Sequence, residues 1–177
     1  MSKFNYHVTV DQEPANPRKM NSNLCHMTLS HKRYDIGDPD QQFNTLDFCG
    51  WSEVQEWLKN EKNAFVIVKV SATDHSSFHI YSGEPKDIWD SGSIGFAWMT
   101  RKELIENFGG DDQKAIDEAI KAINDEINEY DRYLSGTFYL ALIYNEGWEI
   151  VDSCGDFDSR EEAEEWAKET IKELDEN

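Results

Sequence analysis

The sequence has no long apolar run: no stretch of about 18 apolar residues, the length needed to cross a bilayer, occurs among its 177 residues. Residues 1–7 lack the apolar core of a signal peptide. Cysteines are few as well, since only Cys25, Cys49 and Cys154 are present and none belongs to a Cys-x-x-Cys pair. We therefore expect a cytoplasmic protein with no membrane partner, whose thiols stay reduced and pack as structural residues.

Positive charge is scarce, because 17 Lys and Arg stand against 36 Asp and Glu, for a formal net charge of −19. The absence of a basic stripe and of a Gly-rich phosphate loop argues against direct nucleic-acid binding and against nucleotide use. Metal-ligand patterns are missing too. No calcium loop of the form D-x-[DN]-x-[DN]-G occurs, and Cys25-His26 with His31 fits no zinc spacing. The sequence predicts no cofactor.

Aromatic residues, by contrast, are plentiful. Six Trp, seven Tyr and nine Phe make up 12% of the chain, whereas a disordered acidic chain would be poor in them. A length of 177 residues is enough for one domain with one sizeable core. No repeat, low-complexity segment or linker divides the chain, so we expect a single domain over residues 1–177.

Short segments of alternating or β-branched residues predict strands. The segment 64–71 is nearly continuously apolar, which is typical of a strand in the middle of a sheet. Asn145-Glu146-Gly147 predicts a short hairpin loop between the last two strands. The predicted strands are 4–10, 23–30, 64–71, 77–82, 93–99, 137–144 and 148–152.

Capping boxes, in which Ser or Thr is followed three residues later by Glu or Gln, mark helix starts. Boxes at Ser52, Thr100 and Ser159 predict three helices, and a fourth covers 111–134. The order of elements has no regular βαβ alternation, so it predicts an α+β domain with a mostly antiparallel sheet and helices packed on one side. The apolar stripe of the fourth helix is predicted to be Ile116, Ile120, Ile123, Ile127, Tyr130 and Leu134.

Two predicted helical segments carry most of the charge. Residues 111–131 hold eight acids and two lysines, and residues 156–177 hold ten acids and three basic residues, so together they supply −13 of the net −19. Like charges one turn apart weaken an isolated helix unless lysines offset them. In the second segment a glutamate recurs every fourth residue, which lines the carboxylates along one side of a helix, at Glu161, Glu165, Glu169 and Glu173.

These carboxylates admit two interpretations. They are either solvated faces that keep the protein soluble, or a negative surface that fits a basic groove. Nucleic-acid-binding proteins offer such a groove to DNA phosphates, so an acidic folded protein can occupy it in place of DNA. The second interpretation predicts a basic nucleic-acid-binding protein as partner. The predicted contact residues are Asp117, Glu118, Asp125, Glu129, Glu161, Glu165, Glu169 and Glu173.

Catalysis is a rival hypothesis. Asp74-His75-Ser76 and Cys154 supply acid–base and nucleophilic groups. No GxSxG elbow or cysteine-protease context surrounds them, and consecutive strand residues point to opposite faces. Such an enzyme would use Asp74, His75 and Cys154 on a nucleotide-like or signalling small molecule. In a third hypothesis the acidity serves only solubility and the protein has a regulatory or structural role.

Four segments stand out as a set: HKRYDIGD at 31–38, WDSGSIGF at 89–96, YDRYLSG at 130–136 and DSCGDF at 152–157. Their order and spacing resemble a family of small acidic proteins carried by bacteriophages and other mobile elements. Asp-His-Ser at 74–76 also fits the family, whereas the last segment departs from its usual Cys-Trp-Gly-Phe. The resemblance covers most of residues 16–157.

The family has no assigned activity, so the resemblance implies no catalytic residues. It implies a setting inside a bacterial cytoplasm, where small acidic phage proteins often block host defence nucleases, some of them by imitating DNA. The resemblance therefore favours an inhibitor of a host defence nuclease, of the anti-restriction or anti-CRISPR kind, that acts by DNA mimicry through its acidic helix faces.

Overall fold

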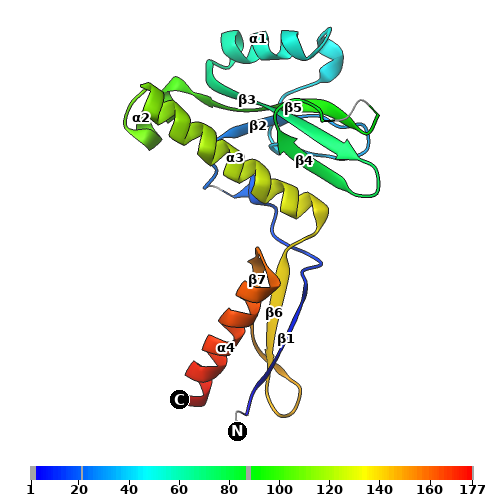
Figure 1. The fold of residues 1–177 in the computed structure, drawn as a ribbon, viewed down its shortest axis with the longest axis vertical. Helices are drawn as coiled ribbons and strands as arrows, with labels where there is room; N and C mark the ends of the chain where they lie inside the picture. Colours follow the sequence, from blue (N-terminus) through cyan, green and yellow to red (C-terminus); the bar gives the residue numbers. More distant parts are fainter. Residues whose placement is uncertain (1–2, 21, 87–88, 177) are drawn as a thin grey trace. The chain divides into compact units, whose positions relative to one another are not determined.

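The computed structural model describes residues 3–20, 22–86 and 89–176, which form four α-helices and seven β-strands in two antiparallel sheets (Figure 1). Contacts divide the chain into two compact units. The central unit is Asn16–Asp131, and the terminal unit combines Met1–Ala15 with Arg132–Asn177. Within the described residues, no helix is long and apolar enough to cross a membrane.

The predicted α+β class and antiparallel pairing are confirmed. The arrangement differs in detail from the expectation, because the strands form two sheets rather than one. The seven predicted strands all exist, with boundaries shifted by a few residues.

The central unit contains a four-stranded sheet in the order β2-β5-β3-β4. β3, predicted to be central, lies between two neighbours. β5 and β2 approach very closely at Gly95, where φ is +148° and an added Cβ would lie 2.1 Å from the carbonyl oxygen of Thr28. The four strands are β2 (His26–Leu29), β3 (Ala64–Asp74), β4 (Phe78–Ser82) and β5 (Ser91–Thr100).

Helices cover both faces of this sheet, although one covered side was expected. α1 (Trp51–Glu61) lies on one side, and α2 (Arg101–Phe108) and α3 (Gln113–Ser135) lie on the other (Figure 1). Val54 and Leu58 of α1 pack against Phe96 and Trp98 of β5. Ala97 lies between Phe96 and Trp98 in β5, so its fully buried side chain points to the opposite face of the sheet.

Two of the three predicted capping boxes lie at helix starts. Thr100 and Glu103 form the complete box at α2, which ends at left-handed Gly109 with φ 78°. Ser159 Oγ accepts the Glu162 N–H, 3.2 Å, at the start of α4 (Arg160–Glu176). The third box was wrong, because α1 begins one residue before Ser52 and its N-cap is Gly50.

The buried stripe of α3 differs from the predicted one. Ile123, Ile127 and Tyr130 are buried as expected. Ala115 and Ala119 are buried in place of Ile116 and Ile120, the latter 36% exposed. Small alanine side chains let the first turns of the helix pack closely, so the bulkier isoleucines lie at the border of the stripe.

The terminal unit is a three-stranded sheet in the order β1-β6-β7 with α4 against one face. Its core is Val8, Ala141, Ala163 and Ala167, flanked by Trp166 and other aromatic residues. The strands are β1 (Asn5–Val10), β6 (Tyr139–Tyr144) and β7 (Ile150–Phe157), and two short 3-10 helices of the central unit are η1 (Pro17–Lys19) and η2 (Thr45–Asp47).

Both ends of the chain contribute to the terminal unit. β1 pairs along its whole length with β6, from Asn5 opposite Tyr144 to Val10 opposite Tyr139. The Lys3 N–H also donates to Asp175 Oδ1 at 3.3 Å, near the end of α4. The first and last described segments are therefore held together.

Candidate functional site

The outward face of α4 keeps the line of glutamates that the sequence predicts. Glu161, Glu165, Glu169 and Glu173 are all exposed. Among the described residues, the first three have no ion-pair partner. Glu164, one position away, takes both nearby cations, with Arg160 Nε at 3.0 Å and Lys168 Nζ at 3.7 Å. The charges of Glu161, Glu165 and Glu169, which lie about 6 Å apart along the axis, are thus not offset by a cation among the described residues.

The predicted residues on α3 are less uniform. Asp117, Glu118 and Asp125 are exposed, and Glu129 is half-buried. Asp117 Oδ1 accepts a hydrogen bond from Gln113 Nε2 at 2.8 Å, and Glu118 lies 3.7 Å from Lys114 Nζ.

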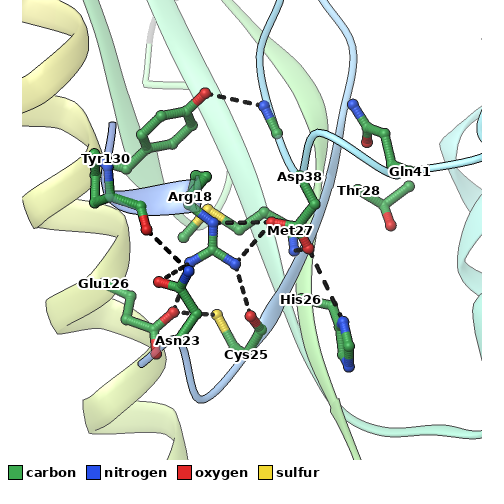
Figure 2. Close-up of polar contacts among 12 residues, drawn as sticks. Arg18, Asn23, Cys25, His26, Met27, Thr28, Asp38, Gln41, Glu126 and Tyr130 are labelled. Atoms are coloured by element: carbon green, nitrogen blue, oxygen red, sulfur yellow. Dashed lines mark hydrogen bonds and ion pairs between the residues drawn. The ribbon is translucent and has the colours of Figure 1, made fainter. Parts of the chain in front are cut away.

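Another acid of α3, Glu126, has its partners inside the central unit (Figure 2). Glu126 Oε2 lies 2.7 Å from Nη1 of Arg18, a guanidinium with only 5% of its residue surface exposed. Asp38 Oδ1 accepts from Arg18 Nε at 2.9 Å, and the carbonyl of Cys25 accepts from Nη2 at 2.7 Å. Glu126 Oε1 also accepts the Leu24 N–H at 2.6 Å. No local sequence pattern points to this cluster, because its members are up to about a hundred residues apart.

Burial and charge together fix the protonation of this cluster. Burial alone would lower the pKa of Arg18, but the carboxylate of Asp38 raises it above its ordinary value. Burial raises the pKa of the Cys25 thiol far above its usual range, and the charge of Glu126 adds to the effect. Cys25 is therefore a protonated packed thiol, as expected, whereas Cys49 is exposed and Cys154 is half-buried.

Further acids near α3 also have internal partners. Asp131 Oδ1 accepts the N–H of Ile80 in β4 at 2.7 Å, and the His79 ring lies 3.2 Å from its other oxygen. Asp111 pairs with Arg101, and Asp112 Oδ1 accepts the Ala115 N–H at 3.0 Å at the start of α3. Asp111, Asp112, Glu126 and Asp131 of this segment thus have partners within the central unit, whereas Asp117, Glu118 and Asp125 are exposed.

The residues of the catalytic hypothesis belong to different units. Asp74 ends β3 and His75 is exposed just after it, both in the central unit, whereas Cys154 lies in β7 of the terminal unit. Asp74 instead pairs with Arg33, and its Oδ2 lies 3.5 Å from Nε2 of His31. No sequence spacing pointed to these partners, since they are more than forty residues away.

His31 has both ring nitrogens engaged. Its Nδ1 accepts the Arg33 N–H at 3.3 Å, so Nε2 carries the proton that faces Asp74. Burial lowers the pKa of His31, Asp74 opposes this, and Arg33 lowers it further. A neutral imidazole with no free lone pair is not placed to act as a general base.

A pocket of about 740 Å³ opens beside this pair. Its volume falls within the range of small-molecule sites. The segments 31–38 and 89–96 both contribute to its lining. Aromatic and polar side chains line it, among them His31, Phe48, Cys49, Trp51, Asp74 and Trp89.

Metal binding has no support among the described residues, where no group of three or more His, Cys, Asp or Glu side chains could hold an ion. The chain matches no protein-family model, no curated protein and no solved structure.

Proposed function

We propose that this is a binding protein that presents the acidic face of α4 to a basic protein surface. The observation that carries the proposal is the line of Glu161, Glu165 and Glu169, three exposed carboxylates without an ion-pair partner in the described residues. Repulsion between them disfavours the isolated helix. A cationic surface would relieve it on binding.

Charge density supports the terminal unit as the binding part. It holds fifteen Asp and Glu against five Lys and Arg, a net charge of −10, within about a third of the chain. The central unit holds twenty-one Asp and Glu against twelve Lys and Arg, a net charge of −9, over nearly twice as many residues. A concentrated negative field speeds encounter with basic partners and repels nucleic acid.

The partner that we propose is a basic nucleic-acid-binding protein, in particular a bacterial defence nuclease of the restriction or CRISPR kind. Its groove attracts phosphates that are closely spaced along DNA, and the α4 carboxylates would occupy it in their place. The resemblance to mobile-element proteins supports this choice of partner and a bacterial cytoplasm as the setting.

Inhibition of purified restriction and CRISPR nucleases, assayed by plasmid cleavage, tests the proposal. Affinity should fall steeply between about 50 and 500 mM salt, because the Debye length shrinks roughly threefold over that range. The triple variant Glu165→Lys, Glu169→Lys and Glu173→Lys should abolish inhibition. A flat salt profile would contradict electrostatic mimicry.

A matched triple variant on α3 serves as the control. Asp117→Lys, Glu118→Lys and Asp125→Lys reverse the same number of exposed charges on the other helix. We expect this variant to lose much less inhibition. Equal losses would mean that net charge alone, rather than the α4 face, sets the affinity.

The pocket beside His31 favours a second candidate function, the binding of a nucleotide-like or signalling small molecule. Its volume and its aromatic lining support binding. If an enzyme used Asp74, His75 and Cys154, then His75→Ala or Cys154→Ala would abolish function and the α4 reversals would do little. If acidity served solubility alone, neither set of changes would matter.

A further inference from the structure

The terminal unit leaves part of a strand edge open. β7 is the last strand in the order β1-β6-β7, so half of its backbone groups face away from β6. Towards its end the edge is approached by the chain after β1, since the Ala15 N–H donates to Asp156 Oδ1 at 3.2 Å. At its beginning, Ile150 and Val151 are 57% and 44% exposed. Residues 150–153 are all exposed and form the accessible part of the edge, in which the Ser153 N–H already donates to Asp152 Oδ1 at 2.8 Å.

Trp148 lies next to this edge in a fixed and unusual conformation. Its indole is 75% exposed, and its φ of 61° is rare for a bulky residue. Asn145 holds the loop in place: its carbonyl accepts the Trp148 N–H at 3.0 Å, and its Oδ1 accepts the Gly147 and Glu149 N–H groups. Little conformational freedom remains to be lost there on binding.

A second aromatic ring lies near the indole. The rings of Tyr144 and Trp148 are 6.0 Å apart, and Tyr144 lies opposite Ile150 in the sheet register. Ala141 and Ile143 are fully buried, so the alternation along β6 places Tyr144 on the face away from α4. Trp148 is exposed and Tyr144 is half-buried, and Trp and Tyr are enriched at the centres of protein interfaces.

Charge decides between the possible occupants of this edge. Glu146, Glu149 and Asp152 flank it and are exposed. A second copy of the chain would bring the same acids and a unit of net charge −10 against them. These acidic residues therefore discourage pairing of two identical edges. A basic strand is attracted where an identical one is repelled.

We propose that residues 150–153 of β7 bind an extended basic segment of a partner protein, which adds a strand to the sheet. Its backbone would pair with β7, its apolar side chains would pack on Trp148 and Ile150, and its lysines would face Glu149 and Asp152. This inference shares with the proposed function only the basic character of the partner, since the edge and the α4 face are different surfaces.

A synthetic peptide of about ten residues that alternates Lys and Val, titrated into the full chain by calorimetry, tests the proposal. Trp148→Ala should weaken binding by about tenfold, as loss of an aromatic anchor does. The matched control is Trp89→Ala, which removes an indole that is 90% exposed on the central unit. That variant should bind as the unchanged protein does, and a peptide that alternates Glu and Val should not bind.

Each contrary result would overturn the inference. No binding of the Lys–Val peptide, or equal losses in Trp148→Ala and Trp89→Ala, would exclude an anchored site at the edge. Binding that is lost in the α4 triple variant but kept in Trp148→Ala would assign the peptide to the acidic helix. A dimer that dissociates on Trp148→Ala would show that a second copy occupies the edge. If the α4 triple variant loses nuclease inhibition but still binds the peptide, the α4 face and the β7 edge are independent sites, and each proposal can fail without the other.

Discussion

α3 and α4 are both acidic helices, but their carboxylates have different surroundings. Both are amphipathic and both belong to strongly acidic segments. On α3, Glu126 and Asp131 bind a buried arginine and a backbone amide of the same unit. On α4, Glu161, Glu165 and Glu169 face water without ion-pair partners in the described residues.

The difference shows that the net charge of a sequence segment does not by itself give the charge that the segment exposes on the folded surface. An acid that is paired inside the fold contributes little to the outer field and much to stability. An exposed acid contributes to the field and little to stability. Substitutions on the two helices should therefore separate into effects on folding and effects on binding.

The largest expected effect is at Glu126. Glu126→Ala leaves Arg18 buried with one carboxylate fewer and deprives the Leu24 N–H of its acceptor. We expect a loss of about 3–5 kcal/mol in the free energy of unfolding, measured by urea denaturation. Asp125→Ala, the exposed neighbour, is the control and should change it by less than about 0.5 kcal/mol. Similar values for both variants would remove the distinction between the helices.

A smaller loss is expected at Asp131. Asp131→Ala leaves the N–H of Ile80, a residue with 3% exposure, without its acceptor. An unsatisfied buried donor costs about 1–3 kcal/mol. Glu129→Ala on the same helix is the control. Hydrogen exchange at the Ile80 amide should accelerate only in the first variant, and an unchanged rate would contradict the role of Asp131.

On α4 we expect substitution of the acids to raise, and not lower, the free energy of unfolding. Neutralising Glu161, Glu165 and Glu169 to Gln removes two like-charge contacts one turn apart, each worth about 0.2–0.5 kcal/mol. The variant should therefore be slightly more stable than the unchanged chain at low salt. The gain should vanish at high salt, where exposed charges are screened. A loss of stability would show that these glutamates have a structural role after all.

The comparison extends to an acid outside both helices, with the smallest expected effect. Burial raises the pKa of Glu103, but hydrogen bonds from the Thr100 N–H and hydroxyl and from His26 outweigh it, so the pKa is lowered. The unfolded chain then binds this proton more readily, and the stability that Glu103 contributes is lost as the pH falls below its ordinary pKa. Glu103→Gln should flatten the acid limb of stability against pH. An unchanged limb would contradict the shift.

Much of the fold was predictable because its signals are local. Thr100 and Ser159 are predicted helix starts because a glutamate follows each of them three positions later. Gly136 is a predicted helix end because it follows the apolar stripe of α3. The hairpin loop at Asn145 was recognised in the same way. The start of α1 was not, because Gly50 offers no side chain to read.

The candidate sites were less predictable, because they depend on contacts between distant residues. The exposed line on α4 followed from spacing alone. The burial of Arg18 beside Glu126 did not, since a charged side chain is expected at the surface until the fold supplies its partners. The contact of Asp74 with His31 was missed for the same reason. The single domain, the partner and the contact residues stay predictions.

The pairing of β1 with β6 sets the order in which the two units can fold during synthesis on the ribosome. β1 emerges first, and the strand that it needs follows only after more than 120 further residues. The whole central unit is made in that interval, and its strands and helices have their partners within reach. The terminal unit, in which negative charge is densest, can therefore form only after the central unit and β6 have been synthesised.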